Sequence, residues 1–199
     1  MTILAINTAF PACNIALARD GTLLAERYEP MVRGQDARLA GLVDETLIEA
    51  GLVMSDLTRI AVVTGPGSFT GVRVGVAFAR GLALVLKVPC VGLTSLEAAV
   101  PIDQESDVLA TLPAQKRPPE LTYWAQHISD GVGLVPPEEL SFEALETRLK
   151  ALGIAQFSDG KPETMAATAA LKAAALNPAD HPPVPAYVRM PDAVPMAPR

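Results

Sequence analysis

Residue types on which many functional sites depend are scarce in this sequence of 199 residues. It has only two cysteines, Cys13 and Cys90, which lie far apart and outside any Cys-x-x-Cys or Cys/His cluster. Its two histidines, His127 and His181, have no His or Cys near them, and Asp130 follows His127 at the end of a predicted strand rather than on a helix. These absences argue against a disulfide framework, a zinc site and a hydrolytic metal centre. We therefore expect no metal site.

Basic charge and long apolar runs are also scarce. Lys and Arg number 16 against 22 Asp and Glu, which gives a formal net charge of −6. Free-standing nucleic-acid binding needs clustered Lys and Arg, so any RNA should be held mostly by another protein. The start, Met1 to Asn7, lacks the basic region of a signal peptide, and no uninterrupted apolar run reaches the roughly 18 residues of a membrane span. We expect a cytoplasmic protein with no membrane contact.

Hydrophobic residues, by contrast, make up 50% of the chain, enough to form a core. Asp20-Gly21 between two apolar runs predicts a hairpin. Apolar periodicity predicts strands at 3–6, 14–18, 23–28, 59–63 and 90–93, and helices at 36–50 and about 70–87. This order indicates an α/β layer with a mixed sheet.

The signal is weaker beyond residue 100. It predicts strands at 108–112, 121–127 and 154–157, a helix from Pro136 to Lys150, and an alanine-rich helix from Lys161 to Leu176. From Asn177 onward recurring prolines predict an extended tail, partly docked through Tyr187-Val188-Arg189. We expect a first lobe over 1–100, a smaller second lobe over 101–176 and a proline-rich segment over 177–199.

A glycine-flanked turn precedes the second predicted helix. Unpaired backbone N–H groups at such a helix N-terminus can receive an anion. The turn lacks the lysine of the Walker pattern, and its last glycine comes one residue late for the dinucleotide fingerprint. The other interpretation is a tight turn in which Ser68 or Thr70 caps the helix, and both stay open. The candidate anion motif comprises Gly65, Pro66, Gly67, Ser68, Phe69, Thr70 and Arg73.

The helix after this turn carries small residues at every fourth position, which form a smooth stripe. That stripe either packs on the chain's own sheet or contacts a partner. The earlier helix has a second, lightly apolar side at Ala37, Gly41 and Ile48, more than one buried face needs. One hypothesis is that the two helices form half of a helical bundle with another chain. The stripe consists of Gly71, Gly75, Ala79 and Ala83, beside Val72 and Val76 and a basic line of Arg73, Arg80 and Lys87.

Groups for autonomous catalysis are missing from the pattern. Asn7 follows the first strand, where a carboxylate could have held Mg²⁺ beside a phosphate, and its amide carries no charge. Ser68 is not in a Gly-x-Ser-x-Gly elbow. An enzyme hypothesis survives nonetheless, in which a small-metabolite kinase or ATPase uses the glycine turn for phosphates.

Several segments together resemble the TsaB (YeaZ) family, closely through about Val100 and loosely beyond it. They are Ile3-Leu4-Ala5-Ile6-Asn7-Thr8, Gly65-Pro66-Gly67-Ser68-Phe69-Thr70-Gly71-Val72-Arg73-Val74-Gly75, Arg80-Gly81-Leu82-Ala83 and Pro185-Ala186-Tyr187-Val188-Arg189. The resemblance implies an α/β protein with the actin-like ATPase (RNase H-like) fold, two lobes and a degenerate second lobe.

The resemblance also implies a function. It implies a non-catalytic scaffold subunit that pairs with the related, metal-bearing subunit TsaD. With the ATPase TsaE, that pair transfers threonylcarbamoyl to N6 of adenosine 37 of tRNAs reading ANN codons, so tRNA contact is indirect. We expect no cofactor on this chain alone, with ATP or ADP confined to the shared interface of the complex.

In the family, the first helix and the helix after the glycine motif form the TsaD contact and can also support homodimers. This implies partner-binding roles for Gln35, Arg38, Leu39, Leu42, Ile48, Gly71, Val72, Gly75, Val76, Ala79, Arg80 and Ala83. Two departures stand out: the family commonly has Asp where Asn7 stands, and residues 113–119 replace its usual Asp-Ala-Arg run.

Overall fold

The first three N-terminal apolar runs form strands, as their periodicity predicts. In the computed structural model, which describes residues 1–114, 121–158 and 160–188, the strands are β1 (Thr2–Asn7), β2 (Ala12–Arg19) and β3 (Thr22–Pro30). Asp20 and Gly21, with φ of 50° and 81°, make the tight turn between β2 and β3. This confirms the hairpin that the Asp-Gly pair predicts.

Two further strands, β4 (Arg59–Val63) and β5 (Cys90–Leu93), complete the first sheet in the order β3-β2-β1-β4-β5. β1, β4 and β5 are parallel, and β2 is antiparallel to both of its neighbours. β1 and most of β4 are buried because helices cover both faces of the sheet. This strand order is that of the RNase H-like and actin-like ATPase class, so the expected α/β fold class is confirmed.

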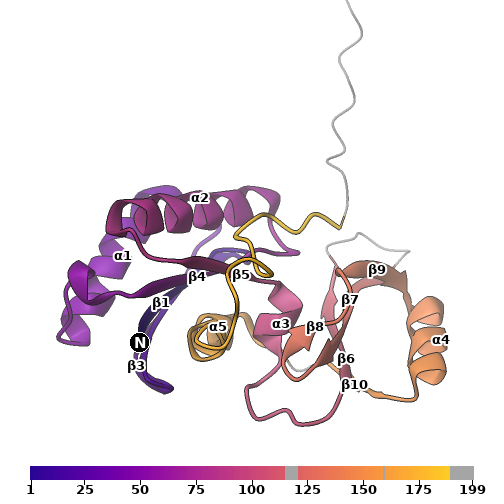
Figure 1. Cartoon of the computed structure of the whole chain (residues 1–199). Helices are drawn as coiled ribbons and strands as arrows, with labels where there is room; N and C mark the ends of the chain where they lie inside the picture. The colour runs from indigo at the N-terminus through magenta and orange to yellow at the C-terminus, as the bar shows by residue number, and fades with distance from the viewer. Residues whose placement is uncertain (115–120, 159, 189–199) are drawn as a thin grey trace, which may run out of the picture.

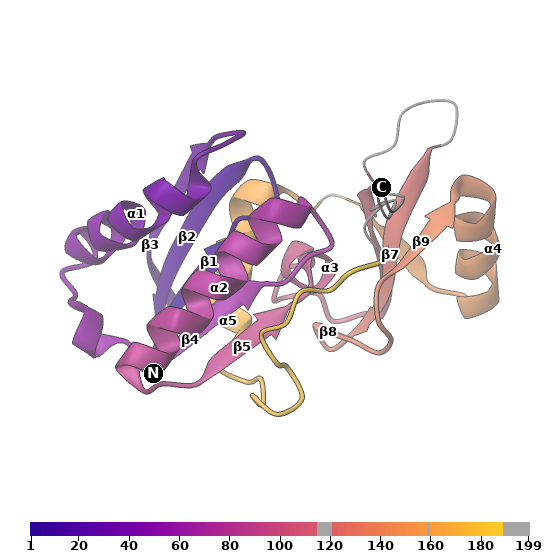
Figure 2. The same ribbon diagram turned by 90° about the horizontal axis from the view of Figure 1, so that it is seen from above.

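Helices form a layer on each side of the first sheet (Figure 1). α1 (Gln35–Glu49) and α2 (Phe69–Leu86) cover one face, and a short 3-10 turn at Met54–Asp56 leads from α1 into β4. α5 (Met165–Lys172) covers the other face against β1, β2 and β4. α3 (Ser95–Ala99) follows β5 and leads toward the second sheet (Figure 2).

The second sheet is smaller. Its path is β10 (Ala155–Phe157), β6 (Val108–Pro113), β7 (Thr122–Ser129) and β8 (Val132–Gly133), and β9 (Glu138–Ser141) also pairs with β7. α4 (Phe142–Leu152) packs on β7 and β9 over a small core of Leu109, Ala125 and Leu145. We call the first sheet with α1, α2 and α5 the first lobe, and the second sheet with α4 the second lobe.

Two predicted helices are wrong in part. The helix expected from Pro136 begins only at Phe142, because residues 138–141 pair with β7 and Ser141 caps the helix by accepting the Ala144 N–H at 3.2 Å. The helix expected over 161–176 is shorter: a 3-10 turn at Pro162–Thr164 precedes α5, which ends at Lys172. Pairing with β7 and packing on the first sheet are tertiary effects that local pattern does not contain.

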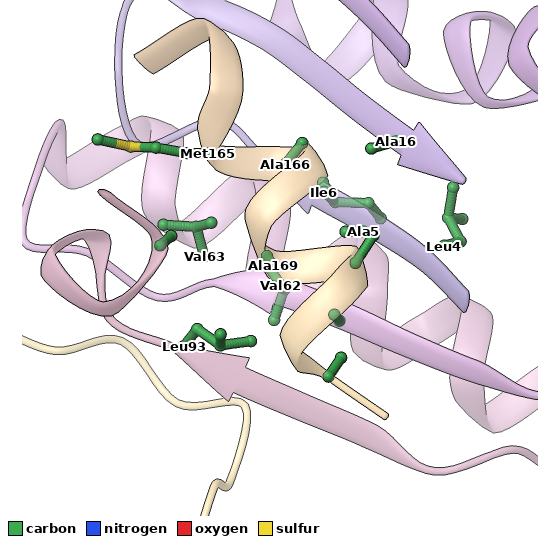
Figure 3. Packing of buried hydrophobic residues seen from close by; sticks show 14 of the residues in the cluster. Leu4, Ala5, Ile6, Ala16, Val62, Val63, Leu93, Met165, Ala166 and Ala169 are labelled. Atoms are coloured by element: carbon green, nitrogen blue, oxygen red, sulfur yellow. The ribbon is translucent and has the colours of Figure 1, made fainter. Parts of the chain in front are cut away.

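α5 also shows that the first lobe is not one continuous segment of the chain, which differs from the lobe boundaries we expected. The expected second lobe of 101–176 includes it, whereas Met165, Ala166 and Ala169 pack on the first sheet among Ile6, Val62 and other labelled core residues (Figure 3). The chain therefore builds the second lobe and then returns to the first. Residues 115–120 of the unusual loop, and Arg189 with the rest of the tail, lie outside the described residues.

Candidate functional site

The glycine turn follows β4 directly. Gly65 has a φ of 94°, which favours glycine, and the Gly65-Pro66 peptide bond is cis. Ser68 is the N-cap of α2, and its hydroxyl accepts the Gly71 N–H at 3.2 Å. The Ser68 N–H in turn donates to the Ala9 carbonyl at 2.7 Å. Two of the N–H groups that could have received an anion are therefore paired within the chain.

The turn after β1 packs directly against this helix start. The Thr8 hydroxyl donates to the Gly71 carbonyl at 2.7 Å. A Cβ on Gly71 would lie 2.1 Å from the Thr8 carbonyl oxygen, and a Cβ on Gly67 would lie 2.3 Å from that of Ala9. Because only glycine permits this approach, these two residues are required to bring the turns together. Carbonyl oxygens of the chain itself, which repel anions, thus face the turn.

The Asn7 side chain is also hydrogen-bonded within the chain. Its side-chain oxygen accepts the Ala9 N–H at 3.0 Å, and its amide nitrogen donates to the Pro162 carbonyl at 3.4 Å. The side chain is buried, with 2% exposure. The residues at the two turns therefore do not fit a magnesium-bound nucleotide, and the capped tight turn is the interpretation that their geometry supports.

The small-residue stripe of α2 faces inward, which corrects the partner-binding roles expected there. Gly75 lies against Thr8, since a Cβ on Gly75 would be 2.3 Å from its hydroxyl oxygen. Ala79 is 0% exposed, so a charged residue at this position tests folding rather than association. Six predicted contact residues on this helix, Gly71, Val72, Gly75, Val76, Ala79 and Ala83, are buried within the chain.

The predicted residues of α1 are also largely engaged within the chain. Leu39 and Leu42 belong to the first-lobe core. Arg38 binds Glu29 through Nε at 2.9 Å and Glu45 through Nη1 at 2.8 Å. Gln35 is half-buried and donates to the Met31 carbonyl at 3.3 Å. The expected contact surface therefore does not form as one set of residues.

The opposite side of these helices is exposed and partly apolar. Ile48 of α1 has 77% exposure, and Leu84 and Val85 of α2 have 79% and 77%. We call this surface the outer α1/α2 face: Ala37, Gly41, Ile48, Ala77, Arg80, Leu84 and Val85, all exposed. Of the predicted contact residues, it retains Ile48 and Arg80. The sequence reasoning missed Leu84 and Val85, although Ala77, Arg80 and Leu84 recur at helical spacing away from the stripe.

The C-terminal segment crosses the end of β5 and the glycine turn. The His181 carbonyl accepts the Gly92 N–H at 2.9 Å, and the Ala186 N–H donates to the Thr64 carbonyl at 2.8 Å. We call residues 181–187 the strap. The Arg73 guanidinium carbon lies 3.7 Å from the Phe69 ring centroid, and Arg73 Nε donates to the Tyr187 hydroxyl at 2.7 Å. The predicted docking through Tyr187 is thereby confirmed, and Arg73 is held by aromatic rings.

α2 also bears on the expectation about membranes. Its 18 residues have a mean hydropathy of 1.6, so by length and composition it is apolar enough to cross a membrane. It is the one such helix in the described part of the chain. This is weak evidence for a span, because the core helix of a soluble protein meets the same criterion.

The strand order and the helices on both faces of the first sheet define an α/β protein of the actin-like ATPase fold class, in which the glycine turn is a capped tight turn. A family model described as TsaD, tRNA N6-adenosine threonylcarbamoyltransferase, matches residues 30–114. TsaB of Escherichia coli is 37% identical over 143 residues, which cover 70% of this chain and 60% of that protein. The aligned region thus spans less than two thirds of that relative. The chain belongs to the TsaB (YeaZ) family.

Two other relatives cover the chain more fully. An uncharacterized protein of Mycobacterium tuberculosis is 36% identical over 98% of this chain and 95% of its own length. The solved structure of YeaZ from Pseudomonas aeruginosa matches with a TM-score of 0.66 and 24% identity, over 94% of this chain and 99% of that one. At that identity, the likeness supports the shared fold only.

Proposed function

We propose that this chain is a non-catalytic cytoplasmic subunit that binds and activates a TsaD-type subunit in forming threonylcarbamoyladenosine. The complex would transfer threonylcarbamoyl to N6 of adenosine 37 of tRNAs reading ANN codons. The names of the TsaB relatives support a role in this biosynthesis. The observation that carries the proposal is the outer α1/α2 face.

That face suits a protein partner. Isolated apolar residues are normal on protein surfaces, but Ile48, Leu84 and Val85 are large, highly exposed and on two helices of one layer. Apolar side chains on helices favour packing against the helices of another chain. A TsaD-type subunit would cover this face in the complex, and a second copy of this chain would cover it in a homodimer.

The closed glycine turn supports a non-catalytic role. The Ser68 N–H donates to the Ala9 carbonyl and the Thr8 hydroxyl donates to the Gly71 carbonyl, so these two donors are already used within the chain. ATP or ADP at the shared interface would then depend on groups of the partner. A TsaE-type ATPase and tRNA complete the proposed assembly, and the net charge of −6 favours indirect tRNA contact.

The test is reconstitution of tRNA modification from TsaD, TsaE and the enzyme that makes threonylcarbamoyl-adenylate, with and without this chain. Product should be lost on omission. Ile48→Glu and Leu84→Glu should each weaken TsaD binding by at least about tenfold, because a carboxylate would be desolvated in an apolar contact. Ile102→Glu is the matched control, since Ile102 is 59% exposed outside this layer. Full product without the chain, or equal binding by all three variants, would refute the proposal.

The competing function is a small-metabolite kinase or ATPase that uses the glycine turn for phosphates. The carbonyl oxygens of Thr8 and Ala9 at this turn count against it. Purified chain that hydrolysed ATP or phosphorylated a metabolite without any partner would reverse the ranking.

A further inference from the structure

A lysine is buried at the junction of the two lobes. Lys172, the last residue of α5, is 8% exposed. Its Nζ donates to the Glu97 carbonyl at 2.8 Å and to the Gly131 carbonyl at 3.3 Å. Glu97 lies on α3, and Gly131 lies in the turn between β7 and β8 of the second lobe. One ammonium group of the first lobe therefore holds a hairpin turn of the second.

The Glu97 carboxylate makes a second link at the same place. One oxygen accepts the Thr94 N–H at 2.6 Å and so completes the capping box of α3. The other oxygen accepts the Gly133 N–H of β8 at 2.8 Å. Glu97 is 6% exposed, so both bonds are made away from bulk water. The carboxylate joins the end of the first sheet to the hairpin of the second.

Gln126 of β7 provides a third link. Its oxygen accepts the Thr94 hydroxyl at 2.6 Å, and its amide donates to the Val135 carbonyl at 2.8 Å. A Cβ on Gly133 would lie 2.0 Å from the Gln126 amide nitrogen, so the hairpin approaches this side chain closely. Thr94, Glu97, Gln126 and Lys172 form one connected group, which we call the lobe lock.

We propose that the lobe lock holds the two lobes at one fixed angle, with Lys172 as its central positioning residue. A rotation of the lobes would separate Lys172 from Gly131, Glu97 from Gly133 and Thr94 from Gln126 together. Each separation removes one partner from a buried polar group, and the three losses come together, so partial opening costs free energy. Burial lowers the pKa of Lys172 to about 8, which agrees with an ammonium drawn out of water for its structural bonds.

The consequence is a chain that acts as a rigid body. Hinge closure in two-lobed proteins depends on a few residues that absorb the backbone change between the lobes. Here side chains from the first lobe and from α3 bridge that junction. The angle between the outer α1/α2 face and the second lobe would then be set before any partner binds.

The test measures the distance between the lobes in the full chain. Spin labels on Ala40→Cys of α1 and Glu146→Cys of α4, both exposed, report the distance by pulsed electron resonance. The pKa values of Cys13 and Cys90 are raised to about 11 by burial, so at pH 7 these thiols react slowly with the label. The lobe lock predicts one narrow distance distribution. A broad or multiple distribution in the otherwise unaltered chain would overturn it.

Variants then identify the residues responsible. Lys172→Met and Gln126→Leu should each at least double the width of the distribution, whereas Lys150→Met, at an exposed position of α4, should leave it unchanged. A folded Lys172→Met or Gln126→Leu chain with the original width would overturn the proposal.

Hydrogen exchange of the otherwise unaltered chain covers the case in which neither variant folds. The Gly133 amide should exchange at least 100-fold more slowly than a free amide, because it donates to a buried carboxylate. Exchange at the rate of a free amide would overturn the proposal.

Discussion

The two helical layers on the first sheet use the same packing chemistry and end in different surroundings. α2 approaches the sheet through Gly71, Gly75, Ala79 and Ala83, and α5 approaches through Ala166, Ala169 and Ala170. Every residue of α5 (Met165–Lys172) is buried or half-buried, whereas α2 leaves Leu84 and Val85 largely exposed. Small residues thus bring a helix close to a sheet, but they do not decide whether its other side stays free.

The reason lies in what covers each layer. α5 has α3 beside it and is tied to the second lobe through Lys172. Its C-terminal end is further held by Arg59, whose guanidinium donates to the Leu176 carbonyl at 2.8 Å and also to that of Ala173. A cation is favoured at a helix C-terminus. The α1/α2 layer has no such cover over its outer face among the described residues, so that face stays exposed.

The largest expected effect comes from a substitution that disrupts the close contact between α2 and the turn after β1. Gly71→Ala should lower the free energy of unfolding by about 3 kcal/mol, because its Cβ would meet the Thr8 carbonyl and the backbone would have to shift. Gly81→Ala on the same helix should raise it by about 0.5–1 kcal/mol, because a Cβ there meets nothing within 4 Å and alanine favours helix. Urea unfolding measures both. Equal effects of the two substitutions would contradict the packing of α2.

The next effect concerns the enclosed layer and pH. Burial lowers the pKa of Lys172 from 10.5 to about 8 in the folded chain. Between these values the unfolded chain binds more protons, so the free energy of unfolding should gain about 2–3 kcal/mol from this group as pH rises from 8 to 10.5. Lys172→Met should remove that rise, and Lys150→Met should keep it. Denaturant unfolding at several pH values between 8 and 10.5 measures this rise. The same pH dependence of the free energy of unfolding in the unaltered chain and in both variants would contradict the prediction.

The strap gives a smaller effect at the start of α2. Tyr187→Ala should cost about 1 kcal/mol, because it removes the hydrogen bond to Arg73 and the contact between the Tyr187 and Phe69 rings. Tyr187→Phe should cost about half as much, because the rings remain in contact. Denaturant unfolding of both variants provides the measurement. A larger loss for the phenylalanine variant than for the alanine variant would exclude this account.

The smallest effect on stability belongs to the outer α1/α2 face. Leu84→Glu should change the free energy of unfolding by no more than about 0.5 kcal/mol, because Leu84 is 79% exposed. The same variant should bind TsaD at least about tenfold more weakly if the proposed function holds. Thermal unfolding measures the effect on stability, and a binding titration measures the effect on the contact with TsaD. A large loss of stability would show that Leu84 contributes to the fold of the free chain.

Much of the first lobe could be predicted from local pattern. The Asp20-Gly21 hairpin, the buried strand from Arg59 to Val63 and the limits of α2 to within one residue follow from turn chemistry and periodicity. The second lobe could not be predicted as well. Residues 138–141 form a strand only because β7 lies beside them, and Glu138-Glu139 alone is as suitable for a helix start.

The candidate site shows the same division. The glycine motif indicated both a possible anion site and a capped turn, and the motif alone could not separate them. The Ala9 and Thr8 carbonyl groups, which decide in favour of the capped turn, belong to a segment about 60 residues earlier in the chain. Lys172 gave no local signal of its position, because an alanine-rich helix does not reveal which of its sides another lobe will cover.

The sequence by itself therefore determined the α/β class, the family and the small-residue stripe, since these depend on periodicity, turn residues and a long motif. Only the tertiary structure decided that the stripe faces inward, that the glycine turn is closed by the chain's own carbonyl groups, and that Leu84 and Val85 are exposed. The physical reason is that a helix presents two sides with similar apolar character, and only contacts between distant segments determine which side is buried.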